Sequence, residues 1–205
     1  MARPPQDPQA RINEILDAAE LLFADKGYRG TTISAIAKKM GVAQGMLYYY
    51  FKSKEEILES LINRQTSSFI SEIKDIACSD TIDPSRKMEL AIHTLLQGVQ
   101  YKSGLFLDFL HDDQQLHIKN KISRHHNHLL TPWLLKIIDE GNQKQYFRVS
   151  HPKTALPFIL IIVELLFDTL YEKLPAELLT LRLRMAEALI EKALGAQDGT
   201  IHILI

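Results

Sequence analysis

The sequence predicts an all-α protein of about nine helices. Apolar residues recur at steps of three and four along most of the chain, and glycines and prolines stand where these stripes break. A chain of 205 residues suits one or two domains and can bury a sizeable core. We expect one domain over residues 9–69 and a second over residues 70–195.

The composition is that of an ordinary globular protein, with 46% hydrophobic and 24% charged residues. Cys78 is the single cysteine, so no intramolecular disulfide can form and a reducing cytoplasm is the expected compartment. Residues 1–8 are polar and proline-rich, without the apolar core of a signal peptide. The longest apolar run, residues 155–167, is too short to cross a bilayer, so we expect no membrane partner.

The first three predicted helices lie close together in the sequence. A helix over residues 8–26 has an apolar stripe formed by Ile12, Ile15, Leu16, Ala19, Leu22 and Phe23. Thr31 or Thr32 then caps a short helix that ends at Gly41. Another short helix begins about three residues later and carries Gln44 to Tyr50. Two short helices joined by such a turn have the form of a DNA-reading helix-turn-helix.

The charge distribution supports this interpretation. Residues 26–54 contain six basic residues and no Asp or Glu, a charge of +6 within a chain of net charge −1. The rest of the chain therefore sums to −7 (−1 minus +6). A local positive field attracts phosphate whatever the net charge. The plainer alternative is a small buried helical hairpin with solvated lysines.

Residues 27–54, with the run GVAQGMLYYYFKSKEEIL at residues 41–58, resemble part of the DNA-binding domain of the TetR family of bacterial transcriptional regulators. The resemblance covers roughly residues 9–69. Its matching positions, in register, are Gly27-Tyr28, Thr31-Thr32, Ile36-Ala37, Gly41-Val42, Gly45, Leu47-Tyr48, Phe51 and Lys54. The rest of the chain matches only in length and helical content. The resemblance implies a helical ligand-binding and dimerisation domain there. The sequence shows no nucleophile–base pair and no glycine-rich phosphate loop, so we expect no enzymatic activity and no cofactor.

The family implies a set of DNA-contacting positions, which are Thr32, Ala43, Gln44, Gly45, Met46, Tyr48, Tyr49, Tyr50 and Lys54. Gln44 has the amide that can pair with adenine, and Met46 can meet a thymine methyl. Gly45 allows close approach of the backbone, whereas Ala43 lacks the hydroxyl common at its position in the family. Thr32, Tyr48 and Lys54 correspond to phosphate contacts.

Three successive tyrosines, Tyr48 to Tyr50, cannot share one buried helix face because they stand about 100° apart. We expect one of them to pack inside the domain and at least one to point outward. Tyr50 stands where the family commonly has a histidine. Leu47 and Phe51 are expected in the core.

Ser53 is expected to cap a long helix that runs to about Ala77 and joins the two domains mechanically. Further helices are predicted over residues 84–101, 105–116, 117–140, 152–174 and 175–194, and Pro132 is expected to kink the helix over residues 117–140. The tail, residues 195–205, could be a disordered end or a segment docked on the body.

The second domain is expected to bind a small molecule between its helices. Candidate lining residues are Met88, Tyr101, Phe106, Phe109, Trp133 and Phe167, although core packing is the competing explanation for each. The last two predicted helices are apolar on more than one side, which predicts a homodimer through a four-helix bundle. Two recognition helices related by two-fold symmetry then predict a palindromic double-stranded DNA operator.

Two rival functions remain open at this point. Asp113 with His117, and His125 with His128, are spaced to share a helix face and could bind a metal, as in a helical metal-dependent enzyme. No HExxH, CxxC or glycine-rich phosphate loop accompanies them, so we expect no metal. The other rival is a DNA-binding recruiter that senses no ligand. The favoured reading is a ligand-responsive regulator, most simply a repressor, whose ligand shifts the population between two states.

Overall fold

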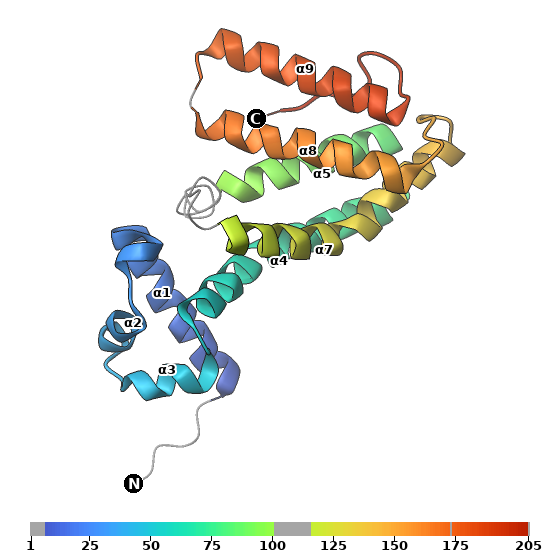
Figure 1. Cartoon of the computed structure of the whole chain (residues 1–205). Helices are drawn as coiled ribbons and strands as arrows, with labels where there is room; N and C mark the ends of the chain where they lie inside the picture. Colours follow the sequence, from blue (N-terminus) through green and yellow to red (C-terminus); the bar gives the residue numbers. More distant parts are fainter. Residues whose placement is uncertain (1–6, 101–115, 173, 205) are drawn as a thin grey trace. The chain divides into compact units, whose positions relative to one another are not determined.

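Eight helices and no strand make up the part of the chain that the computed structural model describes, residues 7–100, 116–172 and 174–204 (Figure 1). The predicted all-helical class is therefore confirmed. The helix expected over residues 105–116 falls almost wholly outside the described residues. The chain divides into two compact units, Met1–Thr66 and Ser67–Ile205.

The N-terminal unit contains α1 (Pro8–Gly30), α2 (Ile33–Met40), α3 (Gln44–Tyr50) and the first half of α4 (Lys54–Cys78). Gly27 interrupts α1 with a φ of 71°, so the regular helix ends beside Lys26 as predicted. Buried Thr31 fixes the following turn, because its hydroxyl donates to the Leu22 carbonyl at 3.1 Å and contacts the Gly27 carbonyl at 3.0 Å. The core of this unit comprises Ile15, Leu16, Ala19, Phe23, Ile36, Ala37, Leu47, Phe51, Ile57, Leu58, Leu61 and Ile62.

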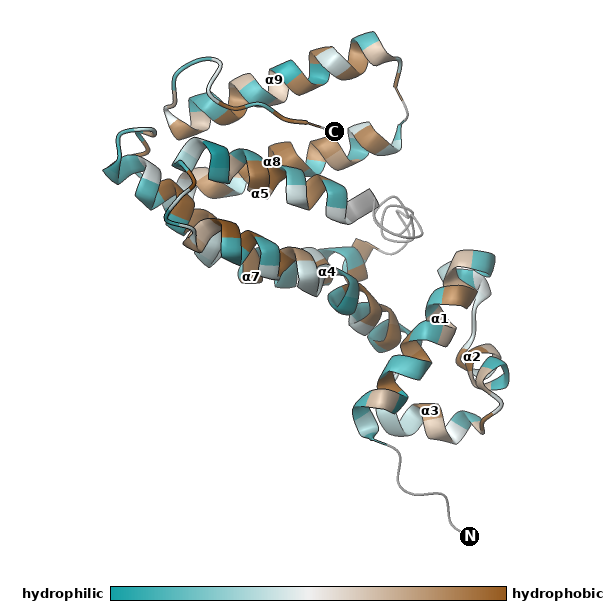
Figure 2. Ribbon diagram, turned by 180° about the vertical axis from the view of Figure 1, so that it is seen from behind, coloured by the Kyte–Doolittle hydropathy of each residue, from teal (hydrophilic) through white to brown (hydrophobic). Residues whose placement is uncertain are grey.

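The C-terminal unit contains the rest of α4 with α5 (Pro84–Gln100), α7 (Leu116–Gln143), α8 (Pro152–Tyr171) and α9 (Ala176–Leu194). The helix α8 packs against α9, α7 and α5, and α5 also packs against α7. Apolar residues from these helices pack into one core cluster. Figure 2 shows how hydrophobic and hydrophilic residues are distributed along the same helices. Their core includes Ile73, Met88, Ile92, Leu96, Leu134, Ile137, Ile138, Phe147, Ile159, Val163, Ile190 and Leu194.

Two predicted boundaries in this unit are wrong by three residues each. The helix α7 runs to Gln143 instead of stopping at residue 140, and α8 ends at Tyr171 rather than at residue 174. Gly141 is buried inside α7, where the Phe147 ring lies so close that a Cβ atom would overlap it. This glycine therefore serves close packing and not chain reversal. Pro132 lies inside α7, as the sequence predicted.

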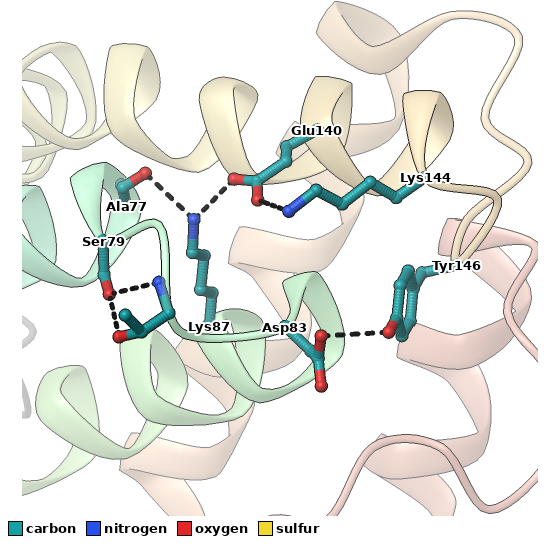
Figure 3. Close-up of polar contacts among 8 residues, drawn as sticks. Ala77, Ser79, Asp83, Lys87, Glu140, Lys144 and Tyr146 are labelled. Carbon is teal, nitrogen blue, oxygen red and sulfur yellow. Dashed lines mark hydrogen bonds and ion pairs between the residues drawn. The ribbon is translucent and has the colours of Figure 1, made fainter.

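A polar cluster ties the end of α4 to α5 and α7 (Figure 3). Lys87 is only 1% exposed, and its ammonium donates to Glu140 at 2.5 Å and to the Ala77 carbonyl at 3.5 Å. Lys144 pairs with the other oxygen of Glu140 at 2.8 Å. Burial alone would raise the pKa of Glu140, but the hydrogen bonds from Lys144 and Lys87 outweigh it and hold this pKa below its ordinary value.

Candidate nucleic-acid interface

The helical hairpin of α2 and α3 is built by local capping. The Thr32 hydroxyl accepts the Ala35 N–H at 3.1 Å, which caps α2. Gly41 ends α2 in the left-handed region, with a φ of 68° that strongly favours glycine. Ala43 then caps α3 without a side-chain hydrogen bond, consistent with the hydroxyl that it lacks. The turn between the two helices is thus set by residues 41–43.

The helix α3 has one buried and one exposed side. Leu47 is fully buried and Phe51 is 5% exposed, so both anchor α3 to the core as predicted. Tyr48 is 49% exposed and Tyr49 is 83% exposed. An apolar anchor on one side and polar aromatic groups on the other give α3 a surface that can contact another molecule.

The remaining α3 positions follow the same division. Gln44 and Gly45 are exposed, together with Ala43, whereas Met46 and Tyr50 are half-buried. The rings of Tyr49 and Tyr50 meet edge to face, with centroids 5.0 Å apart. The expectation that one of the three tyrosines packs inside the unit is met in part, since Tyr50 is half-buried while Tyr48 and Tyr49 are exposed.

Lys54 has an internal role that the sequence did not indicate. Its ammonium donates to the carbonyls of Tyr28 and Thr31 at 2.7 and 2.8 Å and lies 4.2 Å from the centroid of the Tyr28 ring. Partial burial lowers the pKa of Lys54. This lysine ties the start of α4 to the segment before α2, and its phosphate contact stays a prediction. The Gly27-Tyr28 pair was the sequence signal that could have revealed this partner.

The start of α4 is capped as predicted. The Ser53 hydroxyl accepts the Glu56 N–H at 3.1 Å, while the Glu56 carboxylate accepts the Lys52 N–H at 2.6 Å. This reciprocal arrangement resembles a capping box. These hydrogen bonds hold the short connection between α3 and α4, and so hold α3 in place relative to the start of α4.

The basic side chains of this unit lie at its surface. Lys26, Arg29, Lys38, Lys39 and Lys52 are exposed, and no acidic residue separates them in the sequence from residue 26 to residue 54. Their summed field favours phosphate oxygens near α2 and α3. The exposed tyrosines and Gln44 supply hydrogen-bonding groups within the same segment.

The predicted ligand-lining residues do not form a described site. Met88 is 1% exposed within the core, and Trp133 and Phe167 pack against that core. Tyr101, Phe106 and Phe109 lie outside the described residues. A polar surface hollow of about 740 Å³ near the start of α5 is bordered by none of the six. The ligand site therefore stays a prediction.

The histidines of α7 do not converge on a metal site in the described part of the chain. Within residues 7–100, 116–172 and 174–204, no group of three or more His, Cys, Asp or Glu side chains could hold a metal ion. His125 and His128 are exposed, His125 lies beside His126, and Asp113 falls outside the described residues. Burial and the neighbouring His125 lower the pKa of His126 to about 4.

A second surface of interest lies on α8 and α9, which pack against each other. Large apolar side chains line its exposed side, namely Phe158, Ile161, Leu165, Leu178, Leu181, Met185 and Leu189. Their exposed fractions run from 42% at Leu178 to 63% at Phe158 and Met185. By length and composition α8 could also cross a membrane, but its Leu156, Ile159, Val163 and Leu166 belong to the core. We call this set the α8–α9 apolar face.

Comparison with known proteins agrees with the geometry of the N-terminal unit. Residues 15–61 match the family described as bacterial regulatory proteins, tetR family. The transcriptional repressor KstR2 of Mycobacterium tuberculosis is 25% identical over 141 residues, which cover 68% of this chain and 70% of that protein. The fatty acid metabolism regulator protein of Bacillus subtilis is 32% identical over 111 residues, covering 54% of this chain and 57% of that protein.

Solved structures extend the likeness to both units. The regulator FadR of Bacillus subtilis, solved in complex with stearoyl-CoA, has a TM-score of 0.65 at 23% identity, covering 93% of this chain and 99% of that chain. A TetR transcription regulator from Haloarcula marismortui has a TM-score of 0.67 at 20% identity, covering 91% of this chain and 97% of that chain. At these identities the structures show the fold. The N-terminal unit thus contains the DNA-binding segment of the tetR family of bacterial regulatory proteins, and both units share the fold of the two solved regulators.

Proposed function

We propose that this protein is a cytoplasmic transcriptional repressor that binds a palindromic operator as a homodimer and is released by a small molecule. The observation that carries the proposal is the α3 surface, where Leu47 is fully buried and Tyr49 is 83% exposed. A short helix anchored on one side and polar on the other suits insertion into a major groove, which admits an α-helix. Residues 9–69 form the DNA-binding part of this proposal, and residues 70–195 the ligand-binding and dimerisation part.

Each exposed group on α3 has a chemical role in this proposal. Gln44 reads a base edge, because its amide can donate and accept at the same adenine. Tyr48 and Tyr49 donate to phosphate or base edges, and Gly45 keeps the backbone close to the DNA. The surrounding lysines and Arg29 supply the affinity that depends on salt.

The α8–α9 apolar face supports the homodimer. Seven large apolar side chains exposed on two packed helices exceed the scattered apolar residues of an ordinary surface. A second copy related by two-fold symmetry would cover them with the same residues and form a four-helix bundle. Such a dimer carries two copies of α3, which is why the proposed operator is a palindrome.

We propose that the effector is a small molecule with an extended apolar part, bound in the C-terminal unit. The names of the relatives support this class, since a Bacillus subtilis relative is named a fatty acid metabolism regulator and the structure of Bacillus subtilis FadR was solved with stearoyl-CoA. A further neighbour is described as a ketosteroid regulator. We therefore expect a fatty-acyl thioester or a steroid to weaken operator binding by favouring another state of the protein.

The test is selection of bound fragments from genomic DNA, followed by affinity measurements on the best fragment. We expect a palindrome, a steep loss of affinity with salt, and a loss of at least about tenfold for Gln44→Ala. The matched control is Gln97→Ala, an exposed glutamine of α5 that should bind like the parent. The proposed sequence-specific DNA binding would be refuted if no palindrome were enriched, or if Gln44→Ala and Gln97→Ala bound the best fragment with equal affinity.

The same preparation separates the two rival functions. Stoichiometric metal with hydrolytic turnover would favour the helical enzyme. Operator binding that no acyl thioester or steroid alters, together with a retained partner protein, would favour a ligand-insensitive recruiter. Release of DNA by one of these compounds would support the proposed repressor.

A further inference from the structure

The C-terminal segment of the chain lies along α9 on the side where α8 and α5 pack (Figures 1 and 2). The helix α9 ends at Gly195, whose φ is 58°, and Gly199 follows with a φ of 76°. These two positive φ values, which glycine adopts without strain, reverse the chain. Residues 200–204 then run back in an irregular, extended stretch that no helix or strand includes.

The side chains of this segment alternate between core and solvent. Ile201 is 1% exposed and Ile203 is 6% exposed, and both join the hydrophobic core of the C-terminal unit. His202 is exposed and Leu204 is 61% exposed. This period of two is how an extended peptide presents alternate side chains to a binding groove.

The backbone of the segment is held by carboxylates instead of by a neighbouring strand. One oxygen of Glu191 accepts the N–H groups of Thr200 and Ile201, at 2.7 and 2.9 Å. Glu89 of α5 accepts the His202 N–H at 2.8 Å, and Glu187 accepts the Ile203 N–H at 2.8 Å. His93 of α5 also contacts the Leu204 carbonyl at 3.1 Å through its Nδ1.

The N–H groups of residues 200–203 therefore donate hydrogen bonds to three glutamates, of which Glu89 and Glu191 are themselves buried. We call the surface of α5 and α9 that residues 200–204 cover the groove. Emptying it would leave Glu187 and Glu191 without the N–H donors that they accept in the structure, whereas Glu89 would keep its ion pair with Arg86 at 2.8 Å. Buried acceptors that lose their donors are costly, so the groove should favour an occupant of the same kind. The occupant needs consecutive free backbone amides and two apolar side chains two residues apart.

We propose that the groove between α5 and α9 is a binding site for an extended apolar peptide, and that the chain's own residues 200–204 occupy it as a releasable intramolecular ligand. The tail links α5, through Glu89 and His93, to α9, through Glu187 and Glu191. It fastens two helices that both pack on α8. This inference stands apart from the proposed DNA binding, since none of its residues belongs to the N-terminal unit.

The first test measures amide hydrogen exchange, residue by residue, in the intact chain by NMR. We expect protection at residues 200–203, and Glu191→Ala should accelerate Thr200 and Ile201 at least about tenfold more than Ile203. Glu187→Ala should do the reverse, and Glu177→Ala on the first turn of α9 should change none of them. Exchange of these four amides at the rate of an unstructured peptide in the intact chain would overturn the proposal.

The second test asks whether the groove accepts the peptide from solution. The full-length double variant Ile201→Asp and Ile203→Asp should release its own tail, with folding checked by circular dichroism. A labelled peptide with the sequence of residues 199–205 should bind this variant at least about tenfold more tightly than it binds the parent chain, whose groove is filled. Equal binding to both proteins, or equal binding of a peptide carrying the two aspartates, would overturn the proposal. If the variant does not fold, the exchange measurement decides alone.

Discussion

The buried Lys87–Glu140 pair gives a prediction about the C-terminal unit that can be worked from distances and exposure. Glu140→Ala would leave the Lys87 ammonium, 1% exposed, with only the longer 3.5 Å contact to the Ala77 carbonyl (Figure 3). Breaking a buried pair by removing one partner costs about 3–5 kcal/mol. Glu140 is 19% exposed, so water reaches part of the pair, and we expect a loss near the lower limit, about 3 kcal/mol.

The two lysines that share Glu140 are expected to differ. Lys87→Met keeps the buried stem, and Glu140 retains Lys144, so we expect a loss of about 2 kcal/mol. Lys144 is 49% exposed, and Lys144→Met should cost no more than about 0.5 kcal/mol. The order of the three losses is the signature of a pair whose energy depends on burial of Lys87.

The assay is urea unfolding followed by fluorescence of Trp133, which is the single tryptophan and lies in α7 of the C-terminal unit. Because the pKa of Glu140 is lowered on folding, its contribution is present above the ordinary carboxyl value and is lost as the pH falls through the folded value. The difference between the parent and Glu140→Ala should therefore shrink in acid. Equal losses for Lys87→Met and Lys144→Met would refute the reasoning.

Three further predictions concern other parts of the chain. Lys54→Met should lower the free energy of unfolding of the N-terminal unit by about 1–2 kcal/mol, because two carbonyls lose their donor. The variant should therefore be cleaved faster by a protease, whereas Lys52→Met, at an exposed position, should be cleaved like the parent. Met185→Asp should yield a monomer in analytical ultracentrifugation, with Arg184→Asp remaining dimeric as the control. The pKa of His126 is about 4 when folded, so stability should fall as pH drops from about 6.5 to 4, and His126→Gln should remove up to about 2 kcal/mol of that fall in acid denaturation.

Helix content and the hairpin could be predicted from the sequence because their signals are local. Gly41 and Ser53 end or cap their helices through contacts within a few residues and were placed correctly, and Thr32 is one of the two threonines expected to cap α2. The buried roles of Leu47 and Phe51 followed from helical spacing on a short element. Where a position is decided by residues near it in the chain, pattern alone was sufficient.

Positions decided by distant partners could not be predicted in this way. Gly141 reads as a helix end, yet the ring of Phe147 requires it inside α7. The sequence suggests that Lys54 is a cation free to contact phosphate. Its ammonium instead donates to the carbonyls of Tyr28 and Thr31, which lie 26 and 23 residues earlier in the chain. The position of the C-terminal tail could not be predicted, because one of its partners, Glu89, lies 113 residues before His202, whose N–H it accepts.

The helices α8 and α9 are apolar on two sides, one buried in the core and one exposed to solvent. The helix α8 directs Leu156, Ile159, Val163 and Leu166 into the core while Phe158, Ile161 and Leu165 stay in solvent. A sequence pattern detects that both sides are apolar, but only the fold shows which side is already covered. We propose that a second copy of the chain covers the exposed side. The C-terminal tail is fastened to the other side of α9 through Glu187 and Glu191, so a change at either surface acts on one and the same helix.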